Sequence, residues 1–278
     1  MMLTGEMRMY SFRSHGVPPF RVLTVHGGPG AAGELESLAR ELGRKRGVIE
    51  PFQTRTKVKD QIEELRETIA NTCSLPVVLL GHSWGAWLVY LLAAEYGEIV
   101  DRIILVGSGP FEEHYALGMI EKRLSRLDEV DRVRVRKLIS FLETDTGPEN
   151  SGKLSELGKL FLKSDCYDPL EDCEGHDIQC DKGIYERVWS EASSMRRSGE
   201  LLEVGKKINC PVLAIHGDYD PHPSEGVEIP LSEKLNDFKF RLLEKCGHKP
   251  WVEKFAREEF FSIIEEELAG IEQFSTPD

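Results

Sequence analysis

The feature that most constrains this chain is a serine held between two glycines, with an apolar run before it and an apolar helix after it. Residues 76–80 (PVVLL) lead into residues 81–85 (GHSWG), and residues 84–96 have the composition of a buried helix. A continuous apolar run of this length suits a parallel strand that is buried on both faces. The glycines allow a sharp turn from strand to helix where larger side chains would collide with neighbouring segments. The pattern predicts a strained Ser83 whose hydroxyl is exposed as a nucleophile.

Strand-like and helix-like segments alternate along most of the chain. Strands are predicted at residues 7–12, 20–25, 48–49, 76–80, 102–106, 211–215 and 238–243. Amphipathic or apolar helices are predicted at residues 34–46, 58–72, 84–96 and 252–268. Such alternation is typical of an α/β fold with a mostly parallel sheet and helices on both faces.

The alternation is interrupted once, between residues 111 and 207. This stretch contains charged amphipathic helices, predicted at 120–142 and 183–204, and no convincing strand. We therefore expect a core formed by residues 1–110 and 208–278, with residues 111–207 inserted as a helical cap. The insertion leaves from the carboxyl edge of the sheet, where ligands bind in open α/β folds, so the cap should lie over Ser83.

A glycine-rich loop, HGGPG at residues 26–30, follows the strand predicted at 20–25. Such a loop lets backbone N–H groups point at a bound oxygen. An oxyanion hole needs two donors of this kind, one from the residue after the nucleophile and one from this loop. We assign the N–H groups of Trp84 and Gly28, with Gly27 as the alternative to Gly28.

An acid and a base follow the last two predicted strands. The loop HGDYD at residues 216–220 offers Asp218 and Asp220; we favour Asp220 because it lies farther into the loop. Asp218 is expected to cap local backbone N–H groups, and His222 is expected at the surface. His248 lies between the strand at 238–243 and the final helix. The order serine, acid, histidine is one in which a serine nucleophile, its acid and its base follow one another along an α/β sheet.

The net charge of −13 restricts the partners. Phosphate backbones and anionic membranes are bound mainly through Lys and Arg, so neither is expected as a partner. The first ten residues lack a continuous apolar run, and no window resembles a membrane span, so we expect a cytoplasmic protein. The negative surface favours a neutral or cationic substrate.

Three of the six cysteines lie near one histidine, as Cys166, Cys173, His176 and Cys180. The residue types suit zinc, but no Cys-x-x-Cys pair is present and the segment is rich in Asp and Glu. An acidic loop with free thiols is favoured over a zinc knuckle, and no metal or cofactor is expected. With few core-forming residues, this loop is expected to gate access to the site.

Taken together, the GHSWG turn, the HGGPG loop, the acid and the histidine resemble those of the α/β-hydrolase superfamily. HGGPG followed by Gly-x-Ser-Trp-Gly is especially similar to the proline iminopeptidase branch, the S33 serine peptidases. The resemblance implies a cofactor-free Ser-His-Asp hydrolase whose helical cap selects the substrate. Residues 50–54 (EPFQT) depart from the Asp-Gln-Arg-Gly type of segment common in that branch. No single glutamate stands out as the group that grips a free amino terminus; the candidates are Glu112, Glu113, Glu186 and Glu191.

These patterns predict a serine hydrolase that cleaves an ester or amide bond of a small molecule or short peptide through an acyl-enzyme. A prolyl-aminopeptidase-like activity is one reading, and a small-molecule carboxylesterase is its rival. A non-catalytic binding protein with this fold is the third alternative, because a fold does not fix a function. From the cap, we expect Phe111, Trp189 and Glu191 to contribute to substrate binding, although packing of the cap's own core is the alternative for its apolar residues.

Overall fold

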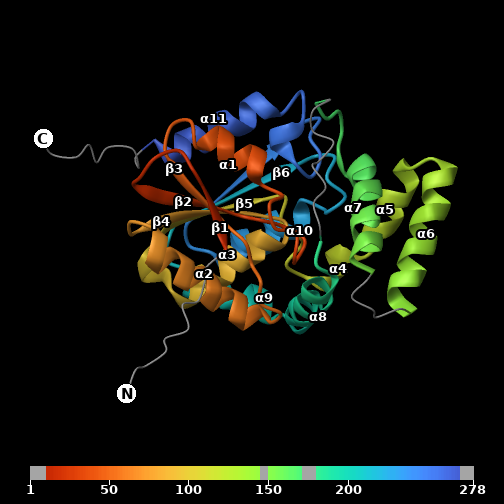
Figure 1. The fold of residues 1–278 in the computed structure, drawn as a ribbon, viewed down its shortest axis with the longest axis horizontal. Coiled ribbons are helices and arrows are strands. Elements are labelled where there is room, and N and C mark those ends of the chain that lie inside the picture. The colour runs from red at the N-terminus through yellow and green to blue at the C-terminus, as the bar shows by residue number, and fades with distance from the viewer. Residues whose placement is uncertain (1–10, 145–149, 171–179, 270–278) are drawn as a thin grey trace, which may run out of the picture.

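The computed structural model describes residues 11–144, 150–170 and 180–269 (Figure 1). Seven strands form one sheet in the order β1-β3-β2-β4-β5-β6-β7. The strands are β1 (Phe12–His15), β2 (Phe20–Val25), β3 (Gly47–Pro51), β4 (Val77–His82), β5 (Val100–Val106), β6 (Val212–Gly217) and β7 (Phe238–Leu243). β1 runs antiparallel to β3, and every other pairing is parallel. The predicted mostly parallel sheet is confirmed.

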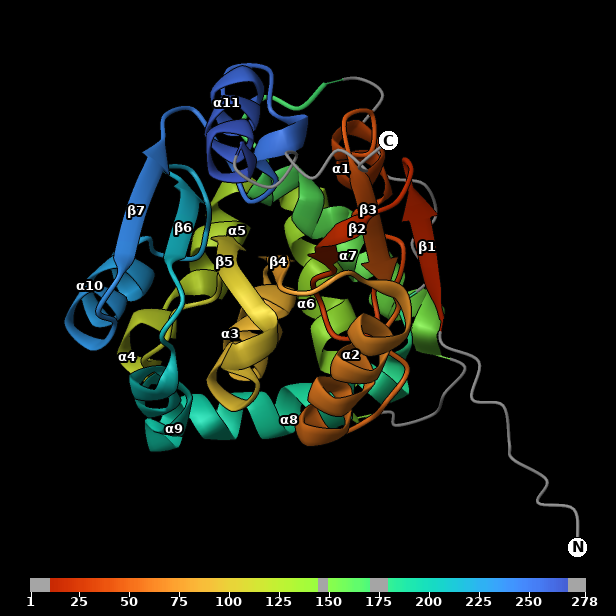
Figure 2. The same ribbon diagram turned by 90° about the vertical axis from the view of Figure 1, so that its left-hand side faces the viewer.

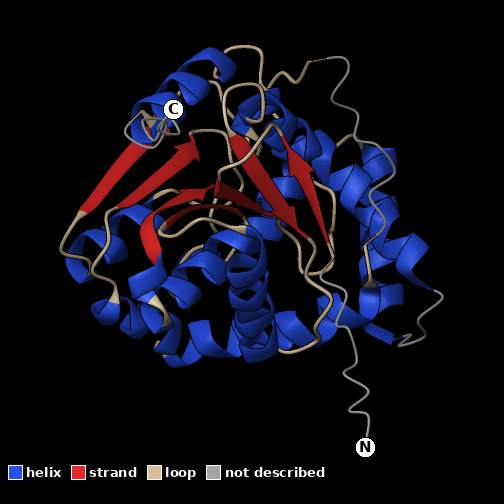
Figure 3. Cartoon of the chain, turned by 60° about the vertical axis from the view of Figure 1, so that its left-hand side comes forward, coloured by secondary structure: helices blue, strands red, loops and turns tan. Residues whose placement is uncertain are grey.

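Helices cover both faces of the sheet (Figures 1 and 3). On one face, α1 (Glu36–Leu42) and α11 (Arg257–Leu268) share a core cluster with the sheet. On the other face lie α2 (Val58–Thr72), α3 (Trp84–Glu95) and α10 (Glu225–Lys234), in a second and larger cluster. This layered arrangement is the α/β-hydrolase fold that the sequence predicts.

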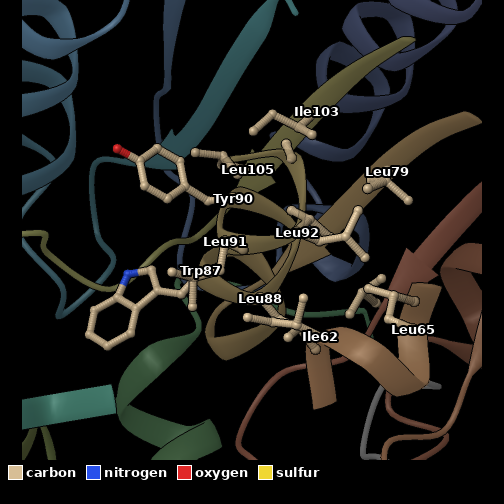
Figure 4. Close-up of a cluster of buried hydrophobic side chains, with 14 of the residues drawn as sticks. Ile62, Leu65, Leu79, Trp87, Leu88, Tyr90, Leu91, Leu92, Ile103 and Leu105 are labelled. Atoms are coloured by element: carbon tan, nitrogen blue, oxygen red, sulfur yellow. The ribbon is translucent and has the colours of Figure 1, made fainter. Parts of the chain in front are cut away.

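Helix α3 is buried nearly all round, which explains its lack of a polar face. It packs on the sheet beside α2, and its leucines lie near side chains from both (Figure 4). Leu88 and Leu92 lie near Ile62 of α2 and Leu79 of β4 in this view. Such packing fixes the beginning of α3, and with it the position of Ser83, relative to the strands.

The described residues between β5 and β6 form helices, as Figure 2 shows for most of them. They are α4 (Glu113–Ala116), α5 (Met119–Arg126), α6 (Glu129–Thr144), α7 (Ser151–Asp165), α8 (Lys182–Ser198), α9 (Glu200–Glu203) and the 3₁₀ helix η4 (Val204–Lys207). Helices α5 to α7 enclose a small apolar cluster of their own. Helices α8 and α9 instead contribute Val188, Ala192 and Leu201 to the main core. The insert therefore has two parts: α5 to α7 pack on one another, and α8, α9 and η4 pack against the core helices α2, α3 and α10.

Several predicted boundaries differ from the observed ones. The helix expected at 120–142 is broken at Leu127, whose backbone is extended, and the helix expected at 183–204 is broken at Gly199, whose φ is 80°. The final helix begins at Arg257 because a separate 3₁₀ turn, η5 (Pro250–Val252), precedes it. Most of the strand expected at 7–12 lies outside the described residues, and β1 begins at Phe12. None of the described helices is long and apolar enough to cross a membrane.

Candidate active site

Ser83 occupies the tight turn between β4 and α3, with φ 53° and ψ −114°. A positive φ is strained for a residue with a side chain. Steric crowding accounts for the flanking glycines: a Cβ on Gly81 would lie 2.2 Å from the Gly85 carbonyl oxygen, and one on Gly85 would lie 2.1 Å from that of Val25. The turn is fastened to the next strand because the Ser83 N–H donates to the Val106 carbonyl at 3.0 Å. The sharp turn expected from the glycines is therefore present.

Asp220 and His248 meet at the carboxyl ends of β6 and β7. The Asp220 Oδ2 lies 2.7 Å from the His248 Nδ1, and both side chains are buried. Because a carboxylate accepts, Nδ1 carries the proton and Nε2 of the neutral ring is left as a base. Burial alone lowers the pKa of His248, but the Asp220 carboxylate outweighs it and raises that pKa. Burial by itself raises the pKa of Asp220, but the neighbouring histidines hold it well below its usual range.

His222 is a buried partner of Asp220, which corrects the expectation that it lies at the surface. Its Nδ1 lies 2.8 Å from the Asp220 Oδ1, and its backbone N–H donates to the same oxygen at 2.9 Å. Burial lowers the pKa of His222 to about 4 despite the nearby carboxylate. His216 Nε2 donates to the His222 carbonyl at 3.0 Å. The sequence signal was the Asp-x-His spacing, because an aspartate commonly accepts from the N–H two residues later.

His248 lies beside the turn that carries Ser83, next to the end of β5. A Cβ on Gly107, the residue after Val106, would lie 3.0 Å from the His248 Nδ1, so the ring lies next to the strand end that holds Ser83. In the described part of the chain, no hydrogen bond joins the Ser83 hydroxyl to His248. Catalytic hydrogen bonds of this kind often tighten only when substrate binds.

The HGGPG loop distinguishes the two glycines proposed for the oxyanion hole. The Gly27 N–H donates to the Glu34 carboxylate at 2.9 Å, so this donor is already engaged. The Gly28 N–H and the Trp84 N–H have no acceptor among residues 11–144, 150–170 and 180–269. Trp84 is the first residue of α3, where backbone N–H groups lack helical partners and the helix dipole favours negative charge. The geometry therefore favours Gly28 over Gly27.

The helical insert contacts the HGGPG loop and the loops that carry Asp220 and His248. Asp181, at the start of α8, donates its N–H to the Gly30 carbonyl at 3.1 Å. Lys122 of α5 donates through Nζ to the Asp220 carbonyl at 2.9 Å. The His248 N–H donates to the carbonyl of Asp165, the last residue of α7, at 2.7 Å. The insert thus lies at the carboxyl edge of the sheet, beside the candidate site.

The three residues expected to bind substrate lie in different surroundings. Phe111 is fully buried and packs against Tyr90, with the ring centroids 4.9 Å apart. Trp189 is partly exposed and stacks on Trp87 at 5.7 Å. The Glu191 carboxylate accepts the N–H of Val58 at 2.9 Å and so caps α2.

Two further glutamates proposed to grip an amino terminus are also engaged. Glu113 pairs with Arg196 at 2.7 Å, and Glu186 pairs with Lys182. These contacts favour a packing role for Phe111 and a capping role for Glu191. Of the four glutamates proposed to bind an amino terminus, Glu112 is the one for which the described residues provide no partner.

The cysteine cluster falls partly outside the described residues. Cys166 and Cys180 are free thiols, whereas Cys173 and His176 are not described. Elsewhere in the described ranges, Asp220, His222 and His248 form a group with metal-ligand side chains. The hydrogen bonds from both imidazoles to the Asp220 carboxylate account for that group without a metal.

Comparison with known proteins agrees with this geometry. Residues 8–262 match the sequence model of the alpha/beta hydrolase family. The chain belongs to this family. It is 24% identical to the proline iminopeptidase of Lactobacillus helveticus (strain DPC 4571), with 90% of each chain covered. It is also 24% identical to the proline iminopeptidase PfmaB of Pestalotiopsis fici, over 71% of this chain and 69% of that one. The resemblance to α/β hydrolases and to proline iminopeptidases is confirmed.

Solved structures share the fold at lower sequence identity. VinJ superposes with a TM-score of 0.69 at 16% identity, covering 93% of this chain and 94% of that one. The thermophilic esterase from Thermogutta terrifontis superposes with a TM-score of 0.64 at 17% identity, covering 95% and 94%. The epoxide hydrolase CorEH superposes with a TM-score of 0.66 at 14% identity, covering 94% of both chains. These structural similarities show that the chain has the α/β-hydrolase fold.

Proposed function

We propose that this protein is a serine hydrolase that cleaves an ester or amide bond through an acyl-enzyme. His248 Nε2 takes the proton from the Ser83 hydroxyl as Oγ bonds to the substrate carbonyl carbon. The N–H groups of Gly28 and Trp84 stabilise the negative oxygen of the tetrahedral intermediate. His248 returns the proton to the leaving group as its bond to carbon breaks. Water then attacks the acyl-enzyme in the same way, with His248 as the base, and the acid product leaves as Ser83 regains its proton.

The observation that carries this proposal is the strained backbone of Ser83, at φ 53°. Backbone strain of this kind costs a residue with a side chain about 1–3 kcal/mol, and strained residues cluster at active sites, where the surrounding structure fixes them. Ser83 directly follows β4, at the carboxyl edge of the sheet where Asp220 and His248 form a 2.7 Å pair. Two unengaged backbone N–H groups lie in the neighbouring loop and helix start.

For the substrate, we propose a small neutral or cationic ester or amide, with the helical insert of residues 111–207 as the roof of the pocket. Its contacts with the Gly30, Asp220 and His248 loops support this place for the insert. The named relatives favour an N-terminal prolyl amide. Among the described residues, Glu113, Glu186 and Glu191 are engaged in other contacts, which leaves Glu112 as the one of the four proposed glutamates available to hold a free amino terminus. The carboxylesterase alternative needs no such carboxylate.

Two experiments test this proposal. Wild-type protein should be labelled by a fluorophosphonate probe, and Ser83→Ala should abolish both labelling and turnover; full labelling of the variant would remove Ser83 from the mechanism. A panel of Pro-, Ala- and Phe-naphthylamides beside short p-nitrophenyl esters separates the two substrate classes. Ester cleavage without arylamide cleavage would refute the peptidase reading. A ligand that binds tightly and is never turned over would support a binding protein instead.

A further inference from the structure

A charged pair next to the candidate oxyanion hole has no part in the proposed chemistry. Glu34 and Lys249 form an ion pair with Nζ 2.8 Å from Oε1, and their side chains are 11% and 12% exposed. Glu34 lies just beyond the HGGPG loop, and Lys249 directly follows His248. The pair therefore connects the loop that supplies the Gly28 N–H to the loop that supplies the base.

The second oxygen of Glu34 holds the HGGPG loop itself. Its Oε2 accepts the Gly27 N–H at 2.9 Å, so the carboxylate binds the peptide directly before Gly28. A third catalytic segment adjoins the same network, because His82, the residue before Ser83, donates Nε2–H to the His248 carbonyl at 3.1 Å. The His82 Nδ1 lies 3.4 Å from Glu34 Oε2. One carboxylate thus contacts segments adjoining the nucleophile, the base and the oxyanion hole.

The charge state of Glu34 fits this arrangement. Burial by itself raises the pKa of the Glu34 carboxyl, but the Lys249 ammonium holds it well below its usual range. Burial lowers the pKa of Lys249, and Glu34 raises it more. Both groups are therefore charged at neutral pH. A hydrogen bond from an amide to a charged carboxylate is stronger and shorter than one to a neutral acceptor, which restrains the Gly27 peptide more tightly.

We infer that Glu34 and Lys249 are positioning residues that fix the oxyanion loop relative to the base and the nucleophile. Glu34 occupies the Gly27 N–H, so that the Gly28 N–H is the one directed at the oxyanion, and Lys249 carries the restraint to the His248 loop. This inference rests on the proposed function, because it assigns the pair to stabilisation of a tetrahedral intermediate. Neither residue touches the reacting atoms.

A positioning role and a merely structural role differ in what they change. An oxyanion donor acts in the transition state, so a loop shifted by a fraction of an ångström lowers kcat and leaves KM nearly unchanged. Affinity for a boronic acid, which forms a tetrahedral adduct on the serine, should fall by the same factor as kcat/KM. A pair that merely stabilised the fold would change the melting temperature and leave these quantities alone.

The test is a double-mutant cycle with Glu34→Gln, Lys249→Met and the double variant. Each single variant should lose about 10-fold in kcat, the order expected for a small misplacement, with KM within about twofold. If the two residues act as a unit, kcat of the double variant falls by about 10-fold, whereas two independent effects would multiply to about 100-fold. Arg102→Met is the matched control, since Arg102 pairs with Glu267 at 3.1 Å away from the site. It should lower thermal stability without changing kcat or boronate affinity.

The outcomes separate this inference from the proposed function. Unchanged kcat and boronate affinity in a folded Lys249→Met or Glu34→Gln variant, with normal fluorophosphonate labelling of the wild type, would overturn the inference alone. Independent, multiplying losses in the double variant would also overturn it. Failure of the wild-type protein to label would overturn both the inference and the proposed function. Lys249→Met leaves the Gly27 acceptor in place, so it provides the test even where Glu34→Gln fails to fold.

Discussion

Asp220 divides its two carboxylate oxygens between two histidines: Oδ2 lies 2.7 Å from the His248 Nδ1, and Oδ1 lies 2.8 Å from the His222 Nδ1. The backbone N–H of His222 also donates to Oδ1, at 2.9 Å. With Oδ1 fixed in this way, the carboxylate cannot rotate freely, and Oδ2 stays aimed at the His248 ring. His222 therefore constrains the orientation of Asp220 and, through it, that of the His248 ring.

Asp220→Asn should lower kcat/KM by about 10³- to 10⁴-fold, because an amide does not hold His248 in the tautomer that leaves Nε2 free. Asp220 also raises the pKa of His248, and the neutral ring is the active base. Activity should thus rise with pH through that pKa in the wild type, and any residual activity of the variant should rise at lower pH. Asp218→Asn is the control, since Asp218 accepts the Cys246 N–H at 3.1 Å. A larger loss in the control would make Asp218 the acid.

His222→Asn should reduce the dependence of stability on pH. The pKa of His222 is about 4 in the folded protein, below the usual value of 6.5, because burial disfavours its charged form. A lowered pKa gives stability that is fully present above pH 6.5 and is lost as the pH falls toward 4. Over that window the wild type should lose up to about 3 kcal/mol relative to the variant, as 1.36 kcal/mol corresponds to each pKa unit. Urea unfolding at pH 7, 5.5 and 4.5 measures this, and parallel curves would contradict it.

Ser83→Gly should be inactive and yet more stable than Ser83→Ala. Both variants lose the hydroxyl, but glycine adopts a φ of 53° without the penalty that a Cβ imposes. The expected difference in the free energy of unfolding is about 1 kcal/mol in favour of glycine. Thermal or urea unfolding of the two variants side by side measures it. Equal stabilities would show that the turn carries no strain from Ser83.

The sequence predicted those elements whose structure depends on neighbouring residues alone, such as regular apolar spacing or a glycine at a tight turn. The helix at 58–72 is observed as α2 with the same bounds, because its apolar spacing is regular. The serine turn was predictable because Gly81 and Gly85 have no room for a side chain. The role of Glu191 was not, since its cap on α2 joins residues 133 positions apart. Likewise, His222 is buried beside the His248 ring, with the ring centroids 4.6 Å apart, and no local pattern shows this contact.

Gly85→Ala should destabilise the fold by at least about 2 kcal/mol, whereas Gly97→Ala should have little effect. A Cβ on Gly85 would lie 2.1 Å from the Val25 carbonyl oxygen, and backbone cannot move aside as a flexible side chain could. A Cβ on Gly97 would have no atom within 4 Å. Melting temperatures of the two variants test the claim that sterics, and no particular chemistry, require this glycine. Similar values for the two would refute it.

Trp189 and Phe111 should respond in opposite ways to truncation. Phe111 is fully buried against Trp87 and Tyr90, so Phe111→Ala should cost about 3–5 kcal/mol in the free energy of unfolding. Trp189 is partly exposed on α8, the helix whose start contacts the Gly30 loop, and its ring stacks with those of Trp87 and Tyr185. Trp189→Leu should therefore change the ratio of kcat/KM between bulky and small acyl esters more than it changes stability, because a pocket wall acts on differential binding of the transition state. The measurement is that ratio beside a urea unfolding curve for each variant. A Trp189 variant that loses stability at constant substrate ratio would assign this ring to the core together with Phe111.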